Sequence, residues 1–187
     1  MSIRDGLLAV LSLGPAYGLQ LHAELASRSP HRGPVNVGQI YATLDRLATR
    51  GLVVGSGSTP DGLPLHSLTG DGERVVREWL SGPMLTAMPD WTEMLDHVVI
   101  TATLDAAASL ALVTGYEGWW RAECAEVSAC LAAEPTAHER LALLARAEQG
   151  AAALRWLADA AVVIGTAQTE RPLSGARPKR GRRPAAA

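Results

Sequence analysis

The chain contains no phenylalanine, only two cysteines, and no apolar run of the length that a membrane span requires. Met1 is not followed by the charged and then apolar residues of a secretion leader, so we expect a cytoplasmic protein without a membrane partner. Cys124 and Cys130 are six residues apart in a segment expected to be helical, which separates them by ~9 Å along its axis. A disulfide needs Cα atoms within ~7 Å, so we expect buried free thiols.

The sequence also lacks the short motifs of common enzyme classes. It has no phosphate-binding glycine loop and no nucleophile elbow. No pair or cluster of its histidines has the spacing of metal ligands, which leads us to interpret them as surface or hydrogen-bonded core residues: His22, His31, His66, His97 and His138. We therefore expect neither enzymatic activity, nor a cofactor, nor a metal ion.

A formal charge of −2 conceals three regions of different sign. Residues 1–80 carry seven basic and seven acidic side chains, whereas residues 81–170 carry four and twelve. Residues 171–187 carry six basic side chains and no acidic one. The charges of the separate regions are more informative about binding partners than the net charge, because the middle region is acidic and the tail is basic.

Residues 36–52 form the most informative stretch, because their pattern predicts a helix with two different faces. Ile40, Leu44 and Leu47 recur at helical spacing and predict a buried stripe. A second stripe is polar and is expected to face outward: Gln39, Thr43, Arg46 and Arg50. Gly51 is suited to end the helix. Taken alone, these residues fit a DNA recognition helix and an ordinary amphipathic surface helix equally well.

The segments around this helix favour the first interpretation. Helices are expected at residues 3–13 and 18–28, and short strands at 52–54 and 64–68 on either side of a turn-rich segment at 55–63. Thr69 can cap a further helix. Three helices, a two-stranded hairpin and a helix in this order are typical of a winged helix-turn-helix. The small residues Gly38 and Ala42 would then allow close approach to a DNA groove.

The region after residue 82 is predicted to be a set of long helices. Asp90, Asp105 and Thr136 are suited to begin helices, the last two reaching about residues 133 and 165, and Glu93 and Glu139 complete possible capping boxes. Five positions of the last helix are expected to be buried: Leu141, Leu144, Leu154, Leu157 and Ile164. Because such helices need each other or a second copy to bury their apolar faces, we expect a homodimer.

Three motifs in residues 1–80 resemble the PadR family of winged-helix transcriptional regulators. They are the segments 15–21 (PAYGLQL), 38–44 (GQIYATL, followed by Leu47 and 51–52) and 68–72 (LTGDG). Over residues 81–170 the similarity is only one of type, a helical dimerisation region. The expected fold is mainly α, with a winged helix-turn-helix at 1–82, a helical dimerisation and effector domain at 83–168, and a disordered basic tail at 169–187.

This resemblance implies a homodimer that binds double-stranded DNA at a palindromic operator, usually as a repressor and often released by a small effector. Tyr41 is similar to the family's phosphate-contacting tyrosine. The chain departs from many relatives at Leu65 and His66 in the second wing strand, where they have a basic and an aromatic residue. That difference puts phosphate contacts by the wing in doubt.

The expected DNA contacts divide by side-chain chemistry. Amide and hydroxyl groups suit base edges, which assigns Asn36, Gln39 and Thr43 there, beside the small Ala42. Phosphate contacts are expected from Tyr41, Arg46 and Arg50. For Arg46 an ion pair with the adjacent Asp45 or with another carboxylate is the competing role. The wing tip, with Ser56 and Ser58, either enters the minor groove or is a solvent-exposed hairpin.

Two hypotheses stay open for the basic tail. Its six positive charges either contact DNA phosphates, which would steepen the salt dependence of binding, or form a disordered solubilising end.

Tryptophans concentrated in the helical region suggest a site for a small aromatic effector, since flat indole rings can sandwich a planar ligand. The candidate residues are Trp91, His97, Trp119, Trp120 and Glu123. Core packing is the competing explanation for them. For the chain as a whole, the alternative to a DNA-binding regulator is a winged-helix module that binds protein, which the near-neutral first 80 residues would suit.

Overall fold

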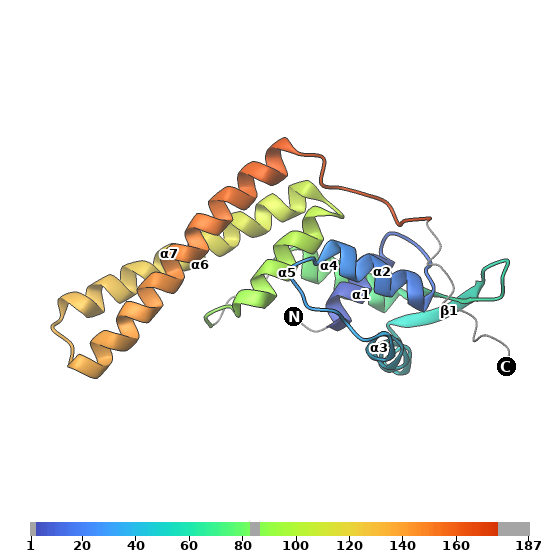
Figure 1. The fold of residues 1–187 in the computed structure, drawn as a ribbon, viewed down its shortest axis with the longest axis horizontal. Helices are drawn as coiled ribbons and strands as arrows, with labels where there is room; N and C mark the ends of the chain where they lie inside the picture. The colour runs from blue at the N-terminus through green and yellow to red at the C-terminus, as the bar shows by residue number, and fades with distance from the viewer. Residues whose placement is uncertain (1–2, 83–86, 176–187) are drawn as a thin grey trace, which may run out of the picture. The chain divides into compact units, whose positions relative to one another are not determined.

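The computed structural model describes residues 3–82 and 87–175, which form two compact units. Described residues 3–79 and 171–175 form the winged-helix unit, and those from 80 to 170 form the helical unit. Within the described residues the chain is mainly helical with one two-stranded antiparallel sheet, which confirms the predicted fold class. Figure 1 shows these elements in chain order.

The winged-helix unit contains four helices and the wing. Helices α1 (Ile3–Leu11), α2 (Gly18–Arg28) and α3 (Val37–Thr49) precede strands β1 (Val53–Ser58) and β2 (Pro64–Leu68), and α4 (Gly70–Leu80) follows. Ile40, Leu44 and Leu47 of α3 are each at most 1% exposed, so the predicted buried stripe is confirmed. They belong to a core to which α1 and α2 contribute Leu7, Leu8, Val10, Leu21 and Leu25.

The wing is longer than the sequence pattern predicts. Residues 55–58 were expected in a turn, but β1 continues through Ser58 and pairs with β2, with a register shift between Gly55 and Ser58. The sequence pattern does not reveal this part of the strand, because residues 55–58 are exposed glycines and serines whose pairing is made by the backbone alone. Ala16 fixes the wing to the turn before α2: its N–H and carbonyl each bond His66, at 3.1 and 2.9 Å.

The end of α3 is fastened to the start of α4. Gly51 ends the helix with a φ of +68°, as its position predicts, and the Thr69 hydroxyl donates to the Gly51 carbonyl at 2.6 Å. The same hydroxyl oxygen accepts the Gly72 N–H at 3.1 Å, so Thr69 caps α4 as expected. A Cβ on Gly72 would overlap the carbonyl oxygen of Leu52, so glycine is required for this close approach.

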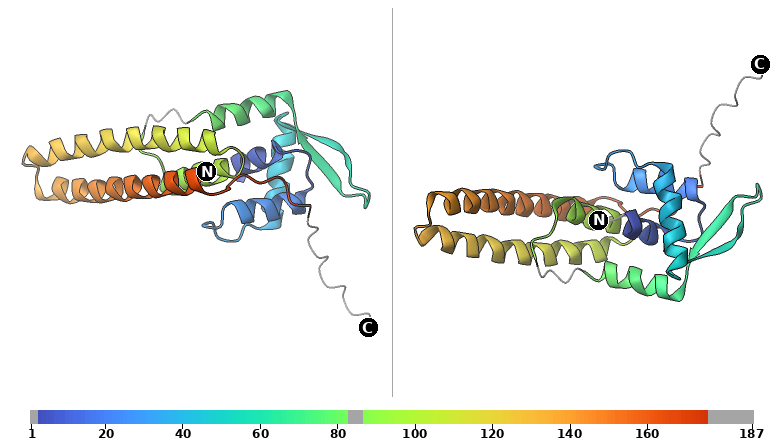
Figure 2. Two further views of the ribbon diagram at one scale, coloured as in Figure 1. Left: turned by 90° about the horizontal axis from the view of Figure 1, so that it is seen from above. Right: turned by 90° about the horizontal axis from the view of Figure 1, so that it is seen from below.

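Three helices form the helical unit, and each begins at the predicted cap. They are α5 (Trp91–Ala102), α6 (Ala106–Ala132) and α7 (Ala137–Thr166). The side chains of Asp90 and Asp105 accept backbone N–H groups at 3.0 and 2.8 Å. Thr136 and Glu139 form the predicted capping box, whose hydrogen bonds lower the pKa of Glu139. Helices α6 and α7 lie side by side in both Figures 1 and 2.

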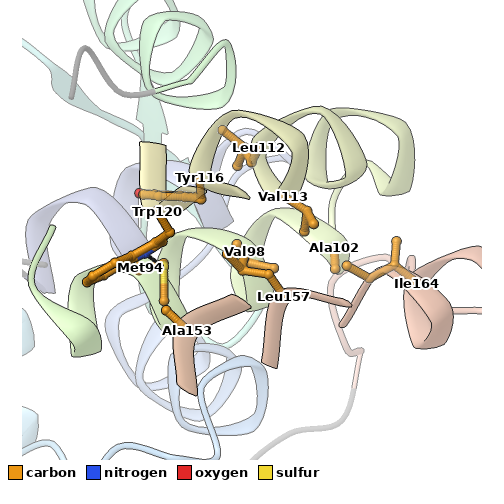
Figure 3. Packing of buried hydrophobic residues seen from close by; sticks show 10 residues of the cluster. All are labelled: Met94, Val98, Ala102, Leu112, Val113, Tyr116, Trp120, Ala153, Leu157 and Ile164. Atoms are coloured by element: carbon orange, nitrogen blue, oxygen red, sulfur yellow. Dashed lines mark hydrogen bonds between the residues drawn. The ribbon is translucent and has the colours of Figure 1, made fainter. Parts of the chain in front are cut away.

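The core of the helical unit is built around Trp120, which has no exposed surface and whose indole N–H donates to Sδ of Met94 at 3.3 Å. Figure 3 shows this cluster, contributed by all three helices: Met94, Val98, Ala102, Leu112, Val113, Tyr116, Trp120, Ala153, Leu157 and Ile164. The burial predicted for Leu157 and Ile164 is therefore confirmed, and Leu154 packs partly buried against the cluster.

Two residues of α7 depart from the predicted burial. Leu141 is 69% exposed and Leu144 is 46% exposed, so these two candidate positions are not buried within the single chain. The neighbouring Leu143 is buried instead. Successive helical residues point ~100° apart, so Leu141 and Leu144 project from other sides of the helix than Leu143.

The two cysteines are free, as predicted, but they are not both buried. Cys130 is exposed and Cys124 is half-buried. Helices α6 and α7 pack closely at Cys124, because a Cβ on Gly150 would lie 2.5 Å from its sulfur.

Candidate nucleic-acid interface

The start of α3 is fixed by Asn36. Its side-chain oxygen accepts the Gly38 N–H at 2.8 Å, and its own N–H donates to the Gln39 side-chain oxygen at 3.4 Å. The two residues thus form a capping box. The spacing of an asparagine and a glutamine three residues later is that of a capping box, so this role could have been predicted from the sequence. From the sequence, both residues are assigned to base contacts alone.

The exposed face of α3 contains Gln39, Ala42, Arg46 and Arg50. The expectation that Thr43 also faces outward is wrong, since Thr43 is only 5% exposed. Its hydroxyl donates to the Gln39 carbonyl at 2.7 Å and accepts from Arg46 Nη2 at 3.1 Å. Thr43 follows Ile40 by three residues and precedes Leu47 by four, which places it at the edge of the buried stripe.

Two arginines give this face its positive charge. Arg46 lies along the helix, because its Nε donates to the Ala42 carbonyl at 3.0 Å while Nη2 bonds Thr43. Arg50 is exposed at the C-terminal end of α3. Within residues 3–82 and 87–175, neither guanidinium forms an ion pair with a carboxylate. Both charges are therefore available to an anionic partner.

A hollow of about 290 Å³ lies beside this face, between α3 and the start of α1. It is lined by Ile3, Arg4, Gln39, Thr43, Arg46, Leu47 and Arg50. Arg4 is a residue that sequence reasoning missed, because only the packing of α1 against α3 brings it here. Its Nε is buried without a hydrogen-bond partner in the described structure. Three arginines thus surround a recess on the outward side of α3.

Tyr41 occupies the opposite flank of α3 and packs over the start of α2. It is 41% exposed, and a Cβ on Gly18 would lie 2.5 Å from its Cε1 atom. Glycine at position 18 therefore makes room for the tyrosine ring. The phenolic hydroxyl is thereby held at the junction of the two helices.

The wing tip is closed by its own hydrogen bonds. The Thr59 N–H donates to the Leu63 carbonyl at 2.9 Å, and the Leu63 N–H donates to the Thr59 hydroxyl at 3.0 Å. Ser56 and Ser58 are exposed on β1. This geometry is compatible with a groove contact and with a solvent-exposed hairpin.

The structure does not gather the five predicted effector residues around one cavity. His97 and Trp120 belong to the interior: Trp120 is fully buried, and His97 Nδ1 lies 3.0 Å from the Tyr116 hydroxyl. Burial, together with the charge of Glu93, raises the pKa of Tyr116.

Trp91 packs edge-on against Trp156, with ring centroids 5.9 Å apart. The remaining two predicted residues, Trp119 and Glu123, share a hollow of about 480 Å³ with Met88, Arg146 and their neighbours. Glu123 accepts from Arg146 at 2.6 Å, which raises the pKa of that guanidinium.

Neither a metal site nor a membrane span is found in the part of the chain that the structure describes. No group of three or more histidine, cysteine, aspartate or glutamate side chains there could hold a metal ion. No described helix combines the length and apolarity needed to cross a membrane.

Comparisons with known proteins point to one family. Residues 7–78 match the model of the transcriptional regulator PadR-like family. The match covers nearly all of the N-terminal segment, residues 3–79, of the winged-helix unit. No curated protein sequence matches the chain.

Several solved structures are similar to the chain. Bacillus subtilis PadR in complex with operator DNA is 17% identical over 86% of this chain and 98% of that chain, with a TM-score of 0.39. The Vibrio cholerae virulence activator AphA is 18% identical over 88% and 98%, with a TM-score of 0.39. Halobacterial (H. salinarum) RosR is 31% identical over 58% and 94%, with a TM-score of 0.38.

Because these TM-scores are low, the assignment rests on the family-model match and on the winged helix-turn-helix that the matched residues form. The matched segment contains α2, α3, the wing and the exposed arginine-bearing face. The chain belongs to the PadR-like family of transcriptional regulators and is a DNA-binding regulator rather than an enzyme.

Proposed function

We propose that the protein is a homodimeric repressor that binds a palindromic operator with α3 in the major groove. The observation that carries this proposal is the exposed face of α3, where Gln39 lies between the arginine-lined hollow and the helix start. A positively charged recess beside a helix with exposed polar side chains suits a DNA duplex, whose phosphates flank the base edges.

The contacts divide between base edges and phosphates. Gln39 is the main base contact, with Asn36 beside it and the small Ala42 permitting close approach, because amides match the donor and acceptor pattern of adenine. Arg46, Arg50 and Arg4 contact phosphates. Thr43 supports Arg46 through its hydroxyl and does not reach a base.

The surrounding elements add two further DNA contacts, one to phosphate and one to the minor groove. Tyr41 reaches the backbone from the junction of α2 and α3. Ser56 and Ser58 of the wing lie against the adjacent minor groove.

Dimerisation is supported by apolar residues that α7 leaves in solvent. Leu141, Leu144, Val162 and Val163 are 69%, 46%, 63% and 56% exposed. Leu144 and Val162 are eighteen residues apart, which is about five turns, so they project from one line of the helix. We propose that a second copy covers this line, as a palindromic operator requires.

A small aromatic effector is proposed for the hollow beside Trp119. Its volume of about 480 Å³ falls within the range of ligand pockets, about 300–1,000 Å³. The half-buried Trp119 ring offers a stacking surface, while Glu123 and Arg146 offer polar groups at its edge. Binding there would release the operator.

An operator-binding regulator acts where the DNA is, and we propose that this compartment is the cytoplasm.

The test is DNA selection. Genomic fragments bound by the full chain are enriched and sequenced, and the enriched sequence is tested by gel shift at low salt against a scrambled duplex of equal length. The expected result is a palindrome bound in preference to the scrambled duplex, with transcription from an adjacent promoter lowered by added protein. A chain that shows no preference for any fragment would instead favour a protein-binding winged helix.

A further inference from the structure

One face of α6 has an aromatic residue followed by two carboxylates at helical spacing. Four residues at positions i, i+3, i+4 and i+7 project from the same side of the helix: Trp119, Ala122, Glu123 and Glu126. All four line the hollow of about 480 Å³, whose remaining walls are Ala87, Met88 and Arg146. The hollow therefore combines an aromatic ring with charged groups one and two turns away from it.

The Trp119 ring is held in place by the core of the helical unit. It meets the ring of Trp120 edge to face, with centroids 4.9 Å apart and planes at 89°. Trp120 is fully buried, whereas Trp119 is half-buried and lines the hollow. The faces of an indole ring carry negative electrostatic potential, so they attract cations. Trp119 thus offers the hollow a fixed aromatic surface that suits a positively charged ligand.

The carboxylates of the hollow are only partly neutralised. The Glu123 side chain is 10% exposed, and its Oε1 accepts from Arg146 Nε at 2.8 Å and lies 2.6 Å from Nη2. Within residues 3–82 and 87–175, Oε2 of Glu123 accepts no hydrogen bond, and Glu126 forms neither a hydrogen bond nor an ion pair. Two carboxylates and one guanidinium give the described lining a net formal charge of −1.

The pKa of Arg146 reflects the same surroundings. The hydrogen bond to Glu123 raises it most, and the charges of Glu123 and Glu126 raise it further. An anionic ligand would therefore have to compete with Glu123 for this guanidinium and would meet the charge of Glu126. A cation meets no such competition at Oε2 of Glu123 or at Glu126.

The rest of the helical region has the same sign as the hollow. Residues 81–170 carry twelve acidic and four basic side chains. Such an excess attracts ions of the opposite sign over a long range, and concave surfaces focus that attraction. The field of the whole region thus favours a cation in the hollow over a carboxylate.

We propose that the hollow beside Trp119 binds a planar aromatic cation, whose ring lies against the indole while its positive group contacts Glu123 and Glu126. This inference rests on the proposed effector site and adds the charge class of its ligand. An aromatic amidinium has the required chemistry. Like the guanidinium of arginine, it is planar and can donate N–H groups to the open oxygen of a carboxylate.

Three ligands of nearly the same shape test the charge class. The compounds 2-naphthamidine, 2-naphthamide and 2-naphthoate are positive, neutral and negative at pH 7. Binding to the full chain is measured by isothermal titration calorimetry at low salt and without DNA. The amidine should bind about 3- to 30-fold more tightly than the amide, the combined scale of one cation–π contact and one exposed charge pair. The naphthoate should bind more weakly than the amide.

Three variants locate the attraction. Glu126→Gln should weaken binding of the amidine by about 2- to 5-fold and leave that of the amide unchanged, because it removes one charge pair. Glu148→Gln is the matched control: it removes the same charge from an exposed position of α7 that does not line the hollow, and it should change neither affinity. Arg146→Gln frees Glu123 and should tighten binding of the amidine by about 2- to 5-fold, a gain that damage to the fold would not produce.

Equal affinities for the three ligands, or tightest binding of the naphthoate, would overturn the charge class while an aromatic site remained. Equal losses of amidine affinity in Glu126→Gln and Glu148→Gln would show that the attraction comes from the overall charge and not from the hollow. If none of the three ligands binds, the hollow is not a ligand site, and the inference fails together with the proposed effector site.

Failure of the proposed effector function alone looks different. Release of the operator is measured separately, by fluorescence anisotropy of labelled DNA with the full chain. An amidine that binds with the expected selectivity but never releases the operator would support the cation site and contradict its role as an effector site.

Discussion

Gly18 of α2 and Tyr41 of α3 fit together so closely that a Cβ on Gly18 would lie 2.5 Å from Cε1 of the tyrosine ring. The glycine therefore determines where the phenolic hydroxyl points. Both residues belong to the segments that resemble the family, which links a backbone position in one helix to a proposed phosphate contact in the next.

Gly18→Ala should displace the Tyr41 ring and weaken operator binding by about 10-fold or more, the scale of one hydrogen bond to a charged group. Tyr41→Phe, which removes the hydroxyl, should have a similar effect in anisotropy titrations. Gly33→Ala is the control, since nothing lies within 4 Å of its added Cβ. In a Tyr41→Ala background, Gly18→Ala should cause no further loss of operator affinity. A further loss as large as that in the unmodified chain would rule out the coupling between Gly18 and Tyr41.

Asn36→Ala should destabilise the protein by about 1 kcal/mol, because it removes the side-chain acceptor that caps α3. Chemical denaturation followed by circular dichroism measures the loss. Asn36→Ser is the control, since serine can cap the helix, and it should retain most of the stability. Equal losses from both substitutions would show that the cap contributes nothing.

Leu144→Glu together with Leu141→Glu should convert the proposed dimer to a monomer in multi-angle light scattering. Both side chains are exposed in the single chain, so the helical content should not change. Operator affinity should fall by about 100-fold or more, since the two half-sites are then bound independently. Ala129→Glu, at an exposed position of α6, also adds a negative charge and should leave the dimer intact. A double variant that stays dimeric would place the interface elsewhere.

Trp119→Ala should weaken the response to a planar aromatic effector. In the unmodified chain, candidate compounds should quench tryptophan fluorescence and release the operator at the same concentrations. The variant should bind them about 3- to 10-fold more weakly, the scale of one aromatic contact. Trp79→Phe, in the winged-helix unit, serves as the control and should preserve both effects. Compounds that quench the tryptophan fluorescence without releasing the operator would argue against the proposed effector site.

The features that the sequence predicts well depend on neighbouring residues. Asp90, Asp105 and Thr136 each cap a helix with a side chain and a backbone N–H three residues apart, and the stripe of Ile40, Leu44 and Leu47 follows from helical spacing alone. Such patterns need no knowledge of the rest of the fold.

Other features depend on packing between distant segments, which one-dimensional patterns do not contain. Helical spacing places Thr43 close to both faces of α3, and only the packing of the unit decides that it is buried. Arg4 reaches the α3 hollow through the position of α1. The hydrogen bond of Arg28 to Arg171 joins residues 143 positions apart. Composition alone therefore predicted a disordered tail from residue 169, whereas residues 171–174 of it bind α2 in the structure. Residues 176–187 of the predicted tail lie outside the described residues.

The most direct test of the account is to compare the DNA preferences of Gln39→Ala and Arg50→Ala by sequencing fragments that each variant selects. Gln39→Ala should relax the preference at one position of each half-site, by about 1–3 kcal/mol of discrimination. Arg50→Ala should keep the selected sequence, weaken all duplexes alike and lower the salt slope by about 0.9. If both variants select the unmodified sequence and lose affinity uniformly, α3 does not read DNA in the way proposed.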